Sequence, residues 1–381
     1  MSSSLASETL KQLHQYTLTA CRLLGVSMTV RGSNHSGPYR EGLPSGIICH
    51  YTASNAAYGP KRPYGRLPVL LSRLRPYSGQ GVGCHVVVWD EPLPRLAELK
   101  RRFPLIKDIP AEVFYFGNEN ALWHAGSANR WSLGIEVRNC GEVTKGKGGY
   151  WWSRGRYRYR GRTPLIMNSR FWEPYTKSQM IGTLWVSRLF AQVHPLEAHR
   201  FLGHTHVSST RIDPGPHFPI HEMRSAVFDT PDIPLLEVPF LQEFSDWKEG
   251  EHPHDDSNVS ESSLHLGLYR HDWDGEFSRD DMRLDKKVLV DQIETPADPQ
   301  LTLKVKKALR RLGYYPGKTD DAVMTDELAD TVVLFQSRWK RRAVVRGRKR
   351  WVQAVPINGK IDQDLVDLIS KFEKQQIYLV S

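Results

Sequence analysis

The chain has 381 residues, which is enough for two domains and a linker. Its hydrophobic fraction of 40% allows a buried core, and no run of about eighteen apolar residues occurs, so we expect no membrane span. The net charge of +10 is uneven, because residues 237–285 hold 14 acidic and 4 basic residues, which leaves +20 on the rest. Such a surface attracts anionic polymers, either nucleic acid or polymers of a cell envelope.

The first residues, MSSSLASETLKQLHQY, lack the basic and apolar regions of a secretory signal, so we expect synthesis in the cytoplasm without a signal peptide. The chain has four scattered cysteines and no CxxC motif. In a protein made without a signal they are expected to be reduced and buried, with no disulfide framework. They are Cys21, Cys49, Cys84 and Cys140.

Apolar periodicity predicts an α/β domain in the first part of the chain. Short apolar runs predict buried strands, and longer runs with helical spacing predict helices. The expected elements are a helix over 5–24, strands over 46–50, 83–89, 112–116 and 132–139, and a long helix over 176–194 that begins at Thr176. This alternation favours a central mixed β-sheet flanked by helices. We place an N-terminal helical extension at 1–43 and the sheet domain at 44–228.

The chain changes character after residue 228. Residues 229–297 lose apolar periodicity and are rich in acidic and polar residues, which predicts a partly disordered linker. Periodicity returns over 298–378, where we expect a small domain of three helices. The first of these helices is closed by Gly313, the second is opened by Thr325, and the third covers 362–374.

Three residues are candidate metal ligands. His50 ends the first predicted strand, His204 follows a glycine in GHTH, and Asp213 precedes Pro-Gly-Pro. Two neutral imidazoles and one carboxylate leave a fourth tetrahedral position for water, which is what a catalytic zinc needs. A histidine at a strand end is more often structural than a ligand, so GHxH followed by DPGP is the stronger of the two signals.

Four motifs carry a resemblance to a known family: GIICHYTAS, WHAGSANRWSLGIEVRN, FWEPYTKSQM and GHTHVSSTRIDPGPHF. Over residues 44–222 the chain resembles the zinc-dependent N-acetylmuramoyl-L-alanine amidases, which include phage endolysins and are similar in fold to animal peptidoglycan-recognition proteins. The resemblance implies a hydrolase that cuts peptidoglycan between N-acetylmuramic acid and L-alanine with a zinc-activated water. A protein that binds peptidoglycan without cutting it is the alternative.

The resemblance also implies roles for individual residues. His50, His204 and Asp213 match the zinc ligands of the family, and Glu136 matches its catalytic glutamate, which would transfer protons. Arg211 stands where the family commonly has a lysine, and a cation there would stabilise the oxyanion. Arginine keeps the charge but is larger and planar, so this position departs from the family pattern.

Other positions near these motifs have more than one interpretation. Trp123 and His124 of WHAG, and Tyr51 after His50, resemble the wall of the substrate cleft, although core packing explains Trp123 equally well. His206 is a rival ligand, but the matching motif uses the histidine directly after the glycine. Thr210 or His206 are alternatives to Arg211 for the oxyanion contact.

The C-terminal segments LKVKKALRRLGYYPGKTDDAVMTDELADTVVLFQ and PINGKIDQDLVDLI resemble the peptidoglycan-binding domain found beside many wall hydrolases. A basic insertion, RWKRRAVVRGRKRW, lies between them. Residues 145–164 alternate Arg and Tyr after a Trp pair, which predicts a hairpin that either binds sugars or is simply solvated. The expected partners are glycan strands and stem peptides, and anionic envelope polymers, rather than nucleic acid. The enzyme would reach the wall or periplasm by holin release, lysis or injection.

Overall fold

The computed structural model describes residues 2–246 and 299–370 except for short gaps, which are 27–35, 40–41, 54–66, 75–82, 90–93, 118–119, 123, 147–150, 154–156, 159–163, 168–169, 209, 346–347, 354–356, 358 and 363–364. Contacts divide the chain into two compact units. The first consists of Met1–His204 and Ile212–Asn258, and the second of Thr205–Arg211 and Val259–Ser381. The four-part division expected from the sequence stays a prediction.

A five-stranded mixed sheet forms the centre of the first unit, which confirms the predicted fold class. The strand order is β12-β2-β6-β3-β4, in which the first four strands are parallel and β4 is antiparallel to β3. All four strands expected from apolar runs are present. The strands are β2 (Gly46–Tyr51), β3 (Val86–Trp89), β4 (Glu112–Tyr115), β6 (Ser132–Val137) and β12 (Phe201–Gly203).

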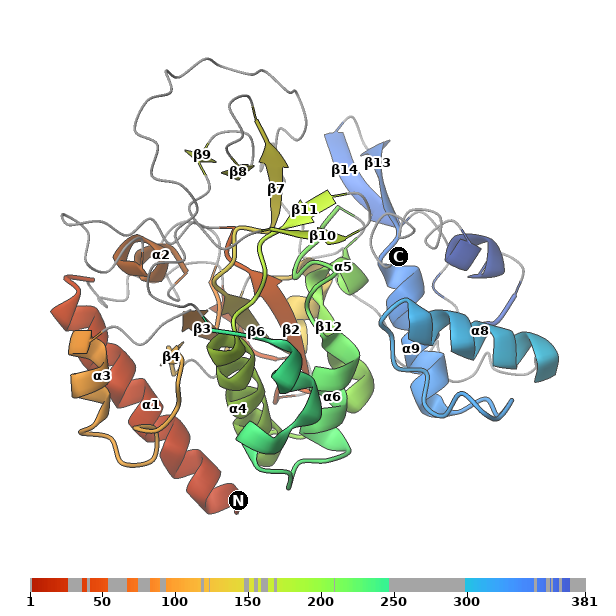
Figure 1. Ribbon diagram of the computed structural model, residues 1–381. Coiled ribbons are helices and arrows are strands. Elements are labelled where there is room, and N and C mark those ends of the chain that lie inside the picture. The colour runs from red at the N-terminus through yellow and green to blue at the C-terminus, as the bar shows by residue number, and fades with distance from the viewer. Residues whose placement is uncertain are drawn as a thin grey trace. The chain divides into compact units, whose positions relative to one another are not determined.

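Helices flank this sheet, and Figure 1 shows α4 beside α6 and α1 beside α3. The long predicted helix is α4, which begins at Lys177 because Thr176 caps it in a capping box with Gln179. The N-terminal helix α1 has Ser2 as its N-cap, slightly earlier than expected. The helices are α1 (Ser3–Leu23), α2 (Leu67–Leu74), α3 (Pro94–Lys100), α4 (Lys177–Val193) and α6 (Ile220–Phe228).

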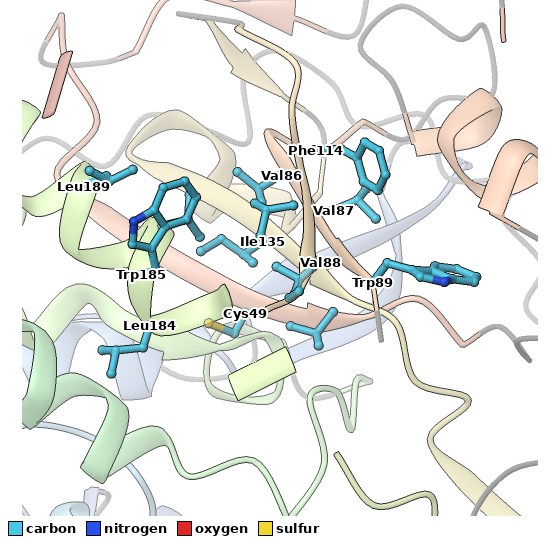
Figure 2. Close-up of a cluster of buried hydrophobic side chains, with 14 of the residues drawn as sticks. Cys49, Val86, Val87, Val88, Trp89, Phe114, Ile135, Leu184, Trp185 and Leu189 are labelled. Atoms are coloured by element: carbon cyan, nitrogen blue, oxygen red, sulfur yellow. The ribbon is translucent and has the colours of Figure 1, made fainter. Parts of the chain in front are cut away.

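Helix α4 covers one face of the sheet with apolar contacts. Val86, Val88 and Ile135 of the strands lie near Leu184 and Trp185 of α4 in the buried cluster of Figure 2. Successive side chains of a strand point to opposite faces. Glu136, which follows Ile135 in β6, therefore points away from α4. In β2, His50 follows the buried Cys49 and also points away from α4.

Two smaller sheets complete the described part of the first unit. One pairs β1 (Ser36–Gly37) with β5 (Ala121–Leu122). The other is antiparallel, in the order β10-β11-β7-β8-β9, and contains the hairpin expected over 145–164. Its strands are β7 (Glu142–Lys145), β8 (Trp151–Ser153), β9 (Tyr157–Arg158), β10 (Leu165–Met167) and β11 (Arg170–Trp172). A ligand for this hairpin stays a prediction.

The start of the predicted linker packs on the first unit. Residues 229–246 contain the 3-10 turns Leu235–Glu237 and Pro239–Glu243, and four of their apolar side chains join the main core. These side chains are Val238, Phe240, Leu241 and Phe244. Apolar residues here follow an irregular spacing, which is why periodicity did not reveal their burial. The rest of the linker, 247–298, lies outside the described residues.

The second unit contains the expected C-terminal helices. They are α8 (Pro299–Arg311), α9 (Asp326–Ser337), which Thr325 caps as predicted, and a helical stretch over 365–370. The basic insertion forms an antiparallel hairpin of β13 (Lys340–Val345) and β14 (Arg348–Gln353). The four cysteines are free and buried. Among the described residues, no helix is long and apolar enough to cross a membrane.

Candidate metal centre

Three buried side chains converge where the parallel strands β2 and β12 end. His50 lies in β2, and His204 directly follows β12. His50 Nδ1 is 2.9 Å from Asp213 Oδ2, and His204 Nδ1 is 3.0 Å from the same oxygen. One candidate ligand atom from each of the three residues lies within 4.8 Å of the others. The fold thus brings together the three residues that the sequence marked as ligands.

The chemistry of this cluster fits a cation. An ionised carboxylate only accepts hydrogen bonds, and so does the imidazole nitrogen that carries no hydrogen. Two imidazole nitrogens can therefore both approach Asp213 Oδ2 only if each carries a hydrogen or if a positive ion lies among them. Two histidines and one carboxylate are also a known ligand set of catalytic zinc, which keeps an open position.

The carboxyl of Asp213 is held as an anion. Burial by itself raises its pKa, but His204 and His50 lower it by more, so that the pKa lies well below its usual range. Tyr175 donates a hydrogen bond to the carbonyl of Pro214 at 2.7 Å, which holds the backbone just after Asp213. Tyr175 belongs to the FWEPY motif, so this motif contributes to the site by supporting the ligand loop.

Glu136 lies beside His50 in the sheet. The two residues are partners in the parallel register of β2 and β6, so their side chains are on the same face, away from α4. Glu136 is buried. The carboxylate that the resemblance marked as catalytic is therefore next to a candidate ligand, although its catalytic role stays a prediction.

His124, expected in the substrate cleft, is buried and lies against His50. His124 Nδ1 is 3.0 Å from His50 Nε2, and His124 Nε2 is 3.2 Å from the carbonyl of Ser132. Burial lowers the pKa of His124 well below its ordinary value, and the nearby His50 lowers it further. No sequence pattern predicted the contact with His50. Substrate contact by His124 stays a prediction.

For the other predicted site residues, the structure gives less detail. Tyr51 ends β2 and is half-buried, and Trp123 lies outside the described residues. Arg211 is half-buried, two positions before Asp213 in the chain, in a segment that belongs to the second unit. The predicted substrate and oxyanion contacts of these residues stay predictions.

The rival histidine, His206, takes no part in this cluster. It belongs to the second unit, where its Nε2 is 3.0 Å from the carbonyl of Leu312. A carbonyl only accepts, so this nitrogen carries the hydrogen. Its carbonyl accepts a hydrogen bond from the Tyr314 hydroxyl at 2.7 Å. These contacts describe a structural histidine.

A buried ion pair supports the end of β6. Arg138 forms a charge-assisted hydrogen bond with Glu173, and Glu173 also accepts from the backbone N–H of Cys140. Gln179 of α4 donates to the carbonyl of Arg138. No sequence pattern predicted this pair, although Glu173 lies in the FWEPY motif. Its role is to link β6 to the chain before α4.

Residues 40–216 match the family described as N-acetylmuramoyl-L-alanine amidase. The match covers a little under half of the chain and includes all three candidate ligands and Glu136. This part of the chain therefore has the sequence pattern of that amidase family, which supports the resemblance seen in the four motifs.

Two solved structures are similar to this chain. One is the complex of the N-acetylmuramyl-L-alanine amidase AmiD from E. coli with anhydro-N-acetylmuramic acid-L-Ala-D-gamma-Glu-L-Lys, 15% identical, with a TM-score of 0.34, over 91% of this chain and 93% of that one. The other is AmpDh3 from Pseudomonas aeruginosa, 14% identical, with a TM-score of 0.31, over 92% of this chain and 96% of that one. No curated protein sequence matches significantly.

Proposed function

We propose that this protein is a zinc-dependent peptidoglycan hydrolase that cleaves the amide bond between N-acetylmuramic acid and L-alanine. The observation that carries the proposal is the convergence of His50 and His204 on one oxygen of Asp213, with Glu136 beside them. All of these residues lie within the stretch that matches the amidase family.

His50, His204 and Asp213 would hold the zinc. When bound, zinc supplies a Lewis acid that polarises the scissile carbonyl and makes water more acidic. The burial of the three ligands limits the access of bulk water, which strengthens electrostatic interactions at this place. The ligand count leaves room for substrate or water.

Glu136 is proposed to move the proton. Its carboxylate accepts a proton from the attacking water and then delivers one to the departing amine, which is a poor leaving group unless it is protonated. Its position on the same sheet face as His50 supports this role. Arg211 is proposed to stabilise the oxyanion through its permanent charge.

The second unit is proposed to hold the wall, on the strength of its resemblance to peptidoglycan-binding domains. Its ligand would be the glycan strands, with the chain's excess of positive charge adding attraction to anionic envelope polymers. We also propose that the protein reaches the wall by holin release or lysis, as a phage endolysin, or by injection, as an effector.

Mass spectrometry of digested peptidoglycan tests the reaction. We expect free stem peptides that begin with L-alanine, together with glycan whose lactyl groups are unsubstituted. Chelation should abolish the release of peptides, and added zinc should restore it. Cleavage at another bond, or full activity in a metal-free preparation, would contradict the proposal. Wall binding with zinc present but no cleavage would favour a recognition protein.

A further inference from the structure

We propose that His124 is a positioning residue that holds the ring of His50 in the tautomer and orientation needed for metal binding. This inference rests on the proposed function only in taking zinc as the metal. It changes the role expected for His124, from a contact with substrate to a contact with a ligand.

The hydrogen-bond partners of His124 determine which nitrogen carries its hydrogen. The carbonyl of Ser132 only accepts, so His124 Nε2, at 3.2 Å, must donate. Ser132 Oγ is 3.3 Å from the same nitrogen and already donates to the carbonyl of Ala128 at 2.7 Å. Both oxygens of Ser132 are thus placed to accept from His124. A neutral ring with hydrogen on Nε2 has its lone pair on Nδ1.

The lone pair of His124 then determines the tautomer of His50. His50 Nε2 faces His124 Nδ1 at 3.0 Å, and so it must donate. A neutral His50 that donates from Nε2 has a lone pair on Nδ1, which is the atom directed at Asp213. This is the form in which an imidazole binds a metal, and a hydrogen bond from its other nitrogen is the usual way to hold it.

The surroundings of His124 keep its ring in this position. Asn129 Oδ1 accepts from the backbone N–H of His124 at 2.9 Å and from that of Ala125 at 2.6 Å. The ring lies over Gly134 of β6, where an added Cβ would be 2.8 Å from ring atoms. Gly134 does not have a positive φ, so glycine is required here for space. Gly134 and Glu136 share a sheet face, which places His124 on the face of the metal centre.

Two variants of His124 separate positioning from packing. In His124→Phe the aromatic ring remains but both nitrogens are lost, whereas His124→Asn keeps an acceptor close to the place of Nδ1. We expect His124→Phe to bind zinc about 10–100-fold more weakly, the usual effect of losing such a partner. His124→Asn should recover most of the affinity. Competition with a chromogenic chelator measures both values.

The order of thermal stability should be opposite to the order of zinc affinity, with His124→Phe the more stable of the two variants. Phenylalanine fills the space of the imidazole better than asparagine does, so a residue needed only for packing would make His124→Phe the less damaging change. Thermal unfolding of the metal-free variants measures this ranking. The visible spectrum of the Co²⁺-substituted protein should also change in His124→Phe and return toward the wild-type spectrum in His124→Asn.

A second pair of variants disturbs His124 without altering it. Gly134→Ala should push the His124 ring away from His50 and weaken zinc binding to a similar extent. The matched control is Gly182→Ala in α4, where the added Cβ would be 2.7 Å from Ala111 Cβ, on the opposite face of the sheet. We expect this control to lose stability and to keep its zinc affinity.

Several results would overturn the inference. One is equal zinc affinity in the wild-type chain and both His124 variants. Another is that the zinc affinities of the two variants rank in the same order as their thermal stabilities. Nitrogen NMR of the zinc-loaded wild-type chain gives a measurement that needs no variant, and a His124 with its hydrogen on Nδ1 would also overturn the inference. If the wild-type chain binds no zinc, the proposed function fails first, and the inference fails with it.

Discussion

His204 and His206 are two residues apart and almost equally buried, but their rings have different kinds of partner. His204 Nδ1 meets a carboxylate oxygen of Asp213 at 3.0 Å, and His50 Nδ1 meets the same oxygen. His206 Nε2 meets a backbone carbonyl at 3.0 Å, and its ring packs edge-on against Tyr314. Burial therefore does not distinguish a ligand from a structural histidine in this chain.

The hydrogen-bond partners of the two rings distinguish His204 from His206. The N–H of His206 Nε2 and the carbonyl of Leu312 satisfy each other, so this contact needs no ion. His50 Nδ1 and His204 Nδ1 both face one oxygen of Asp213, and when both nitrogens carry lone pairs a cation would be needed between them. The comparison teaches that a metal ligand is recognised by unbalanced acceptors and not by depth in the protein.

Replacing His204 should have the largest effect. His204→Ala removes one of the three proposed ligands, so we expect zinc affinity to fall by more than the roughly 10–100-fold expected for His124→Phe, and wall lysis to disappear. Zinc content after dialysis measures the loss, and the matched control is His206→Ala. Retention of zinc by His204→Ala would contradict the comparison.

Glu136→Gln sharpens the comparison by separating metal binding from proton transfer. Glutamine has nearly the same size as glutamate but cannot carry the proton. We expect zinc content to stay at the wild-type level while turnover falls by roughly two to four orders of magnitude, the usual weight of a general acid or base. Turnover of a soluble muropeptide checks this, and near-normal turnover would remove Glu136 from the mechanism.

His206→Ala should affect stability and leave the metal in place. The substitution leaves the buried carbonyl of Leu312 without this N–H donor, so the free energy of unfolding should fall by about 1–3 kcal/mol. Gly313 supports the structural reading, because an added Cβ there would be 2.2 Å from His206 Nε2 and its φ is +91°. Loss of zinc from His206→Ala would mean that His206 is a ligand.

Tyr314→Phe should have the smallest effect. It removes only the hydroxyl that donates to the carbonyl of His206 at 2.7 Å and keeps the aromatic contact with that ring. We expect a loss of roughly 0.5–1.5 kcal/mol in the free energy of unfolding and no change in zinc affinity. Denaturant unfolding followed by fluorescence measures the first, and a larger effect on zinc than on stability would contradict the assignment.

Local chemistry made much of the fold predictable. The strands β2 and β6 are short apolar runs, and α4 begins where Thr176 and Gln179 form a capping box, a signal that depends on four neighbouring residues. His50 was identified because a polar residue follows the apolar run there, whereas Glu136 was identified only through the resemblance to the amidase family. The motif order then pointed to the amidase family, which the match over 40–216 supports.

Contacts between distant parts of the chain were not predictable in the same way. His50 and His124 are 74 residues apart, and no local pattern states that their rings meet. A signal did exist, since Gly134 is an isolated glycine in an apolar strand, which often marks a close approach. The packing of residues 229–246 on the first unit was missed because their apolar positions follow no regular period.

The sequence by itself determined which side chains are able to bind a metal or move a proton, because that ability belongs to the residue type. It also determined where β2, β6 and α4 lie, through apolar runs and a capping box. Only the tertiary structure decided that His204 meets Asp213 while His206 meets a carbonyl, and that His50 has Glu136 and His124 as neighbours. The physical reason is that hydrogen-bond partners in a sheet are set by strand register and by loops that return from far along the chain.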